Sequence, residues 1–162
     1  MNKMAVLSDD KRYRYSLGRE WDPGLPKVTW IMLNPSTADA NVDDPTIRRC
    51  IGFARAWGRG GITVVNLYAF RATDPRRLMG NLDIVGPDND EHLRAAIGDG
   101  SGYPVPLVVA AWGTRAHPER VRQVQNIVCE RRGMLSVLGL TKDGHPKHPL
   151  YIKGDTWPQV WA

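Results

Sequence analysis

Four short clusters of polar or conformationally special residues follow four apolar runs along the chain. The clusters are Asn34-Pro35-Ser36, Asn66-Leu67-Tyr68, Trp112-Gly113-Thr114 and His148-Pro149-Leu150. Amides, hydroxyls and an imidazole can hydrogen-bond a ligand, position a water molecule or stabilise the charge of a leaving group. We therefore take these clusters as the candidates for a functional site.

The first cluster leads into a polar segment with several aspartates. Asn34 cannot titrate, but its amide can hold a water molecule or read the edge of a base, or it can close a turn at the end of a strand. Ser36 and Thr37 can donate to a phosphate or cap a turn. Of the acids, Asp44 is placed to cap the following helix, and Asp39 is a candidate general base or cation ligand. The spacing of the acids matches no known metal loop, so we expect neither a metal nor a cofactor.

The second and third clusters offer hydrogen-bonding and stacking groups. Asn66 ends an apolar run, so its amide needs either a backbone partner or the hydrogen-bonding edge of a ligand. Tyr68 can stack on a base or fill the core. Trp112 and Gly113 end the third run and complete this set of candidate substrate-binding residues.

The fourth cluster contains the best single candidate for chemistry. His148 lies in the segment His145-Pro146-Lys147-His148-Pro149, where two prolines restrict the backbone and would hold an imidazole in a defined place. An imidazole titrates near neutral pH or donates while neutral. The alternative is a surface histidine in a C-terminal loop. Leu150 is either a wedge that inserts into a base stack or a core residue.

The charge pattern is compatible with a polyanionic partner. The formal net charge is +5, and arginine dominates the excess of basic residues. Guanidinium groups match phosphate geometry better than ammonium groups do, although a solvated surface explains the same pattern. The candidate phosphate contacts are Arg48, Arg71, Arg76, Arg115 and Lys147.

The elements that must position these residues alternate between strands and helices. Apolar runs at 28–33, 62–67, 107–111 and 135–138 predict strands buried on both faces. Helices are expected after Asp44, Asp88 and His117. One or two N-terminal strands are expected within 5–21, at an edge of the sheet because basic residues crowd this segment: Lys11, Arg12, Arg14 and Arg19. This order predicts a three-layer α/β/α sandwich with a mainly parallel four-stranded central sheet. In such a sheet the four clusters meet beyond the carboxyl ends of the strands.

The bulk properties indicate a soluble protein with one domain over residues 1–162. Hydrophobic residues make up 42% of the chain, and no apolar run is long enough to span a bilayer or to form a signal peptide. The two cysteines, Cys50 and Cys129, are expected as buried thiols of a reducing compartment. We therefore predict a cytoplasmic, monomeric protein. The fingerprints of nicotinamide-binding enzymes, P-loop kinases and α/β-hydrolases do not occur.

Several segments resemble one bacterial and phage family of unknown function. The segments are MLNPSTAD, DDPTIRRCIGFARAWG, VVNLYAFRATDP, VGPDND, AWG and LTKDGHPKHPLY, which together span nearly the whole chain. The order of the motifs is also distantly similar to that of the uracil-DNA glycosylase superfamily. That resemblance implies a glycosylase-like fold, with Asn34 positioning a water molecule, His148 stabilising the departing base and Leu150 inserting into the strand. Met32 and Ser36 stand where the motif of that superfamily has glycines.

Two functions follow from the resemblance and the residue types. The first is a DNA glycosylase that hydrolyses the N-glycosidic bond of a damaged or modified base, which requires a flipped base, a positioned water and donors for the leaving group. The second is a non-catalytic module on the same fold that binds nucleic acid or a nucleotide. Base release separates the two.

Overall fold

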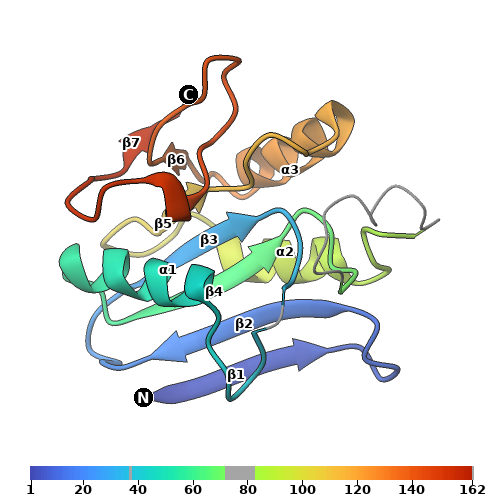
Figure 1. The fold of residues 1–162 in the computed structure, drawn as a ribbon, viewed down its shortest axis with the longest axis horizontal. Coiled ribbons are helices and arrows are strands. Elements are labelled where there is room, and N and C mark those ends of the chain that lie inside the picture. Colours follow the sequence, from blue (N-terminus) through green and yellow to red (C-terminus); the bar gives the residue numbers. More distant parts are fainter. Residues whose placement is uncertain (37, 72–82, 162) are drawn as a thin grey trace.

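The described residues of the computed structural model, 1–36, 38–71 and 83–161, form a single mixed β-sheet with helices on both faces (Figure 1). The strands are β1 (Asn2–Leu7), β2 (Arg14–Glu20), β3 (Lys27–Met32), β4 (Gly61–Asn66), β5 (Leu107–Ala110), β6 (Leu135–Val137) and β7 (Gln159–Val160). The helices are α1 (Pro45–Ala56), α2 (Asn89–Ile97), α3 (Pro118–Glu130) and the short 3-10 helix η2 (Pro149–Tyr151). The strand order is β1-β2-β4-β3-β5-β6-β7.

The four predicted apolar runs form the centre of this sheet. β4, β3, β5 and β6 are neighbours and run parallel, with Met32 of β3 level with Asn66 of β4. Their side chains are almost all buried, as the continuous apolar runs predicted. The α/β class is therefore confirmed. The predicted sheet of four strands is too small, because seven strands of the described chain join one mixed sheet.

The strands outside the parallel centre explain this difference. β1 and β2 pair antiparallel, and β2 in turn pairs antiparallel with β4, so only β1 lies at that edge. The expectation that the whole 5–21 segment lies at an edge is therefore wrong for β2. At the other edge, β7 pairs antiparallel with β6. β7 has two exposed residues and no apolar pattern that could have indicated a strand.

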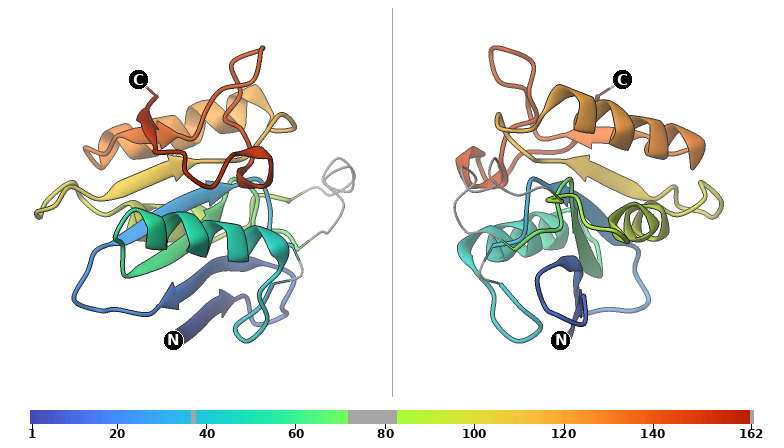
Figure 2. Two further views of the ribbon diagram at one scale, coloured as in Figure 1. Left: turned by 60° about the vertical axis from the view of Figure 1, so that its left-hand side comes forward. Right: turned by 90° about the vertical axis from the view of Figure 1, so that its right-hand side faces the viewer.

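Two buried clusters of side chains separate the layers. α1 packs on one face of the sheet, where Phe53 and Trp57 stack beside Trp30 of β3. α2 and α3 cover the other face, where Leu93 and Val124 join the opposite side chains of the same strands. Figure 2 shows α1 and η2 on one side of the sheet and α2 and α3 on the other.

The predicted helix starts are in place, and two predictions of burial are wrong. The carboxylate of Asp44 accepts the Ile47 backbone N–H (2.8 Å) at the start of α1. Cys50 is buried as expected, but Cys129 is exposed on α3. The six tryptophans of so small a chain predict that Trp157 and Trp161 of the C-terminal tail pack on the core; Trp161 does, whereas Trp157 is 64% exposed.

Candidate functional site

A cavity of about 650 Å³ opens at the carboxyl ends of the parallel strands, on the face of the sheet that α1 covers. We call it the rim cavity. It is lined by Arg14, Met32, Leu33, Asn34, Ser36, Thr46, Ile47, Val64, Asn66, Trp112, Gly113, Thr114, Arg115, Thr141, Lys147, His148, Leu150 and Tyr151. Val64 and Asn66 both line the cavity because they lie two residues apart in β4 and so face the same side.

The rim cavity brings together residues from all four predicted clusters, which lie far apart in the sequence. The predicted residues that line it are Asn34, Ser36, Asn66, Trp112, Gly113, Arg115, Lys147, His148 and Leu150. They meet because three of the clusters follow the ends of β3, β4 and β5, which are adjacent parallel strands. The fourth cluster reaches the same place because the Gly113 backbone N–H donates to the Pro146 carbonyl (2.9 Å).

Asn66 presents a buried amide without a partner. Its side chain is 1% exposed, and neither Oδ1 nor Nδ2 has a hydrogen-bond partner among the described residues. A buried amide that lacks hydrogen bonds costs about 1–3 kcal/mol of stability. The amide carries one acceptor and a donor group side by side, which suits a ligand edge with the complementary pair.

His148 is held in a defined tautomer at the cavity wall. It precedes η2 with extended backbone, and its Nδ1 accepts the Leu150 backbone N–H (3.2 Å). In the neutral ring, Nε2 therefore carries the proton and acts as a donor. Burial lowers the pKa of His148 below its usual 6.5, against the opposing field of Asp44. His148 is thus a neutral donor at physiological pH.

Helix α1 fixes the segments on both sides of the cavity. At its N-terminus, the second carboxylate oxygen of Asp44 accepts the Ser36 hydroxyl. Further along, Arg49 donates to the backbone carbonyls of Pro149 (3.2 Å), the first residue of η2, and of Ile152, which directly follows η2. One rigid element therefore sets the positions of both walls.

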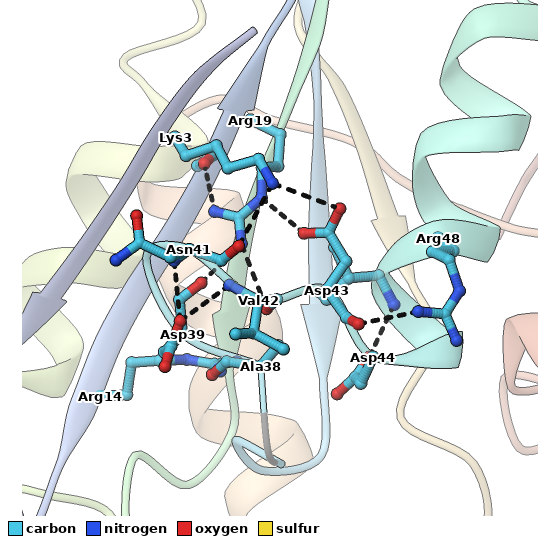
Figure 3. A network of polar contacts seen from close by, with 12 residues as sticks. Lys3, Arg14, Arg19, Ala38, Asp39, Asn41, Val42, Asp43, Asp44 and Arg48 are labelled. Atoms are coloured by element: carbon cyan, nitrogen blue, oxygen red, sulfur yellow. Dashed lines mark hydrogen bonds and ion pairs between the residues drawn. The ribbon is translucent and has the colours of Figure 1, made fainter.

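The β3–α1 connection is held by two buried arginines of β2 (Figure 3). The Nε of Arg19 pairs with Asp43 Oδ1 (2.8 Å), and its Nη2 donates to the Asp39 carbonyl. Arg14 donates through Nη1 to the Ala38 carbonyl and also lines the rim cavity. Burial, the largest cause, lowers the pKa of Arg14 to about 10.

Other predicted residues lie outside the rim cavity. Tyr68 packs on the α2–α3 face, where its hydroxyl accepts the His117 backbone N–H (3.0 Å). The Asp39 carboxylate accepts the Asn41 (2.7 Å) and Val42 (2.8 Å) backbone N–H groups, which hold the pKa of Asp39 below its usual range. These roles are those of a core residue and a turn residue, so we leave both out of the site.

The remaining predicted positions are also accounted for. Pro35 and Asp44 are buried beside the cavity without lining it, and Asp44 serves as the helix cap. Arg48 donates to the Asp43 carbonyl (2.8 Å), and Arg71 donates to the Lys11 carbonyl (3.2 Å); neither lines the cavity. Thr37 and Arg76 lie outside the described residues.

Sequence reasoning missed several lining residues, of which Arg14 is the most informative. Arg14 was placed among the charges of an edge strand, whereas pairing of β1 with β2 buries it. Thr114 and Tyr151 directly continue two predicted clusters and could have been included on that ground. Thr46 and Thr141 carried no sequence signal.

The charged side chains that line the described part of the cavity are all basic. The charged side chains of the described chain that line it are Arg14, Arg115 and Lys147, and the described lining includes no carboxylate. Arg115 and Lys147 are exposed at the mouth, whereas Arg14 is 2% exposed. The arrangement suits a ligand that carries negative charge.

Comparison with known proteins gives one family. The model of the family described as "Protein of unknown function (DUF1643)" matches residues 14–150. The chain belongs to this family. No curated protein and no solved structure matches the chain significantly. Family membership agrees with the first of the two resemblances, and the matched range includes every described residue that lines the rim cavity except Tyr151. None of the helices in the described residues is both long and apolar enough to cross a membrane.

Proposed function

We propose that this DUF1643 protein binds a base of DNA in the rim cavity and hydrolyses its N-glycosidic bond, the base being damaged or modified. The observation that supports the proposal best is the convergence of Asn66 and His148 on one cavity. The first supplies an unpaired amide for the edge of a base. The second supplies a neutral N–H donor for the charge that develops on a leaving base.

The walls of the cavity suit a flat heterocycle. Its volume of about 650 Å³ accommodates a base with its sugar. Trp112, 2% exposed, forms an apolar wall, and Met32 forms part of the floor beside Asn66. Met32 occupies the place of a glycine in the glycosylase motif, so the substrate differs in shape from uracil.

The proposed reaction requires little covalent assistance. The bond between C1′ and the base nitrogen breaks, and the base leaves with the electron pair while the sugar becomes cationic at C1′. Asn34 positions a water whose oxygen bonds to C1′, and the proton that this water loses passes to the departing base or to solvent. His148 donates through Nε2 to the base as it becomes anionic, which stabilises the transition state more than the ground state.

The mouth of the cavity suits a DNA backbone. Arg115 and Lys147 are exposed there and can contact the phosphates that flank a flipped nucleotide. Leu150 is 44% exposed and Tyr151 is 83% exposed beside them. An exposed apolar side chain at this position can fill the gap that the flipped base leaves in the stack.

Base release tests the proposal. The protein is incubated with DNAs that carry uracil, hydroxymethylated and glucosylated pyrimidines, and deaminated purines, and the freed base is identified by mass spectrometry. We expect release from one of them, and its loss in Asn34→Ala and His148→Ala. His145→Ala is the matched control, since His145 lies in the same loop but does not line the cavity. Turnover that survives in His148→Ala refutes the proposed mechanism.

A binding module without catalysis is the second candidate. The observation that favours it is the contact of Asn34 Nδ2 with the Pro35 carbonyl (3.0 Å), which ties the amide to its own turn. The described cavity lining also offers no carboxylate to activate a water. Salt-dependent binding of DNA or a nucleotide with no base released from any substrate would favour this alternative.

A further inference from the structure

Three arginines of the described chain are buried, and two of them pair with a carboxylate. Arg19 pairs with Asp43 and donates to three backbone carbonyls, those of Gly18, Asp39 and Val42. Arg120 pairs with Asp90 Oδ1 (2.8 Å) and donates to the Leu67 carbonyl (2.8 Å). Each of these guanidinium groups therefore has a carboxylate partner inside the protein, as buried charges normally require.

Arg14 is the exception. It is 2% exposed, yet it makes no ion pair within the described part of the chain, and its Nε has no hydrogen-bond partner there. Among the described residues, its one side-chain hydrogen bond goes from Nη1 to the Ala38 carbonyl. A guanidinium has five N–H donors, so most of its capacity is unused.

Asp44, the acid whose field acts most strongly on Arg14, does not supply the missing partner. The field of Asp44 raises the pKa of Arg14, but burial outweighs it and lowers the pKa to about 10. The two oxygens of Asp44 accept the Ile47 N–H and the Ser36 hydroxyl, and no ion pair joins Asp44 to Arg14. The fields of Arg71 and Arg19 oppose those of Asp44 and Asp39 at this position.

The guanidinium of Arg14 lies at the rim cavity, where a ligand can contact it. Arg14 is the first residue of β2, and β2 runs antiparallel to β4, so Arg14 lies beside the carboxyl end of β4 that carries Asn66. Its backbone N–H donates to the Ala69 carbonyl just beyond that end (3.0 Å). Both side chains line the rim cavity. A ligand that hydrogen-bonds to the Asn66 amide can therefore also contact the Arg14 guanidinium.

We infer that the ligand of the rim cavity carries an anionic oxygen group, a carboxylate or a phosphate, which pairs with Arg14. This inference rests on the proposed use of the cavity for a base and names the class of that base or nucleotide. A planar guanidinium binds either group through two N–H donors. If the substrate is DNA, its backbone phosphates stay at the mouth, so the anion is on the base. If the ligand is a free nucleotide, the anion is its phosphate.

Calorimetric titration of the full chain distinguishes these sources. The probes are pairs that differ in charge: 5-carboxyuracil with 5-carboxamidouracil, deoxyuridine 5′-monophosphate with deoxyuridine, and deoxyadenosine 5′-monophosphate with deoxyadenosine. We expect the anionic member of at least one pair to bind about 10- to 100-fold more tightly, the range of a charge-assisted hydrogen-bonded pair. The pair that shows the preference identifies the source of the anion.

Variants assign the preference to Arg14. Arg14→Gln should reduce the ratio to near one, and Arg14→Lys should retain part of it. Arg12→Gln is the matched control, because Arg12 is exposed two residues away and does not line the cavity. If Arg14→Gln does not fold, the Nε–H resonance of Arg14 in the wild-type protein should still shift when the preferred anion is added.

The inference fails if no pair differs by more than about threefold in the wild-type protein, or if the ratio survives in Arg14→Gln. Its failure is separable from that of the proposed reaction, since binding is measured without turnover. His148→Ala should abolish base release and leave the anion preference in place. A preference without base release from any DNA would remove the reaction and retain the anion site.

Discussion

Replacing Asn66 by leucine should stabilise the protein and abolish the proposed base release. The unpaired amide of Asn66 is 1% exposed, and a leucine of similar size needs no hydrogen bonds in the same place. Removing an unsatisfied buried amide should add about 1 to 2 kcal/mol to the free energy of unfolding. For a chain of 162 residues this corresponds to a rise in Tm of roughly 2 to 8 °C.

A second buried asparagine provides the control for this variant. Asn89 is 0% exposed, and although its Oδ1 has no partner among the described residues, its Nδ2 donates to the carbonyls of Asn66 (3.0 Å) and Leu67 (3.2 Å), which leucine would leave without this donor. Asn89→Leu should therefore lower the free energy of unfolding by about 1–3 kcal/mol, the opposite sign. Thermal unfolding of both variants by circular dichroism, together with base release and DNA binding, measures the contrast. A Tm of Asn66→Leu that falls as far as that of Asn89→Leu would refute the reasoning, because it would mean that the amide is satisfied in the folded protein.

Three further outcomes follow from the same structure. Burial lowers the pKa of His148, so the folded protein binds this proton less readily than the unfolded chain does. The neutral His148 therefore contributes stability above about pH 6.5, and this contribution is lost as the pH falls toward the folded pKa. The drop in Tm between pH 7 and 5 should be smaller in His148→Ala than in the wild-type protein. Cys129 is exposed, whereas burial raises the pKa of the Cys50 thiol, so mass spectrometry should detect one alkylated cysteine in the native protein and two in denaturant. Arg115→Gln and Lys147→Gln should each weaken DNA binding and reduce the slope of log K against log salt by about one, whereas an unchanged slope would place the DNA elsewhere.

The sequence was sufficient to predict the parallel centre of the sheet and the place where the candidate residues meet. Continuous apolar runs such as Val28–Leu33 indicate strands covered on both faces, and adjacent parallel strands bring their carboxyl ends together. Asn66 and His148 could therefore be assigned to one edge of the sheet without knowledge of their contacts. The sequence could not show that the Asn66 amide lacks a partner among the described residues, or that the Leu150 N–H fixes the tautomer of His148, because both depend on the three-dimensional contacts.

The errors have physical causes that a single sequence does not reveal. Basic residues around Arg14 resemble the charges that protect an edge strand, but β1 takes the edge and buries β2. From the sequence, Tyr68 is either a stacking residue or a core residue, and it fills the core on the α2–α3 face because the strand ends at Asn66 and the alternation of faces does not continue beyond it. β7 contributes two exposed residues, too few for a periodicity to be recognised.

The attachment of both cavity walls to α1 limits how a ligand can enter. Asp44 holds one wall and Arg49 the other, and five residues of helix correspond to about 7.5 Å along its axis. A third tie, from the Trp57 indole N–H to the Thr156 carbonyl (3.0 Å), fixes the C-terminal segment at the far end of the same helix. Because both walls are hydrogen-bonded to the same helix, α1 keeps the separation between them constant. If the rim cavity binds the proposed base, that base enters a space whose width α1 holds constant, and its thickness limits access before any hydrogen bond forms.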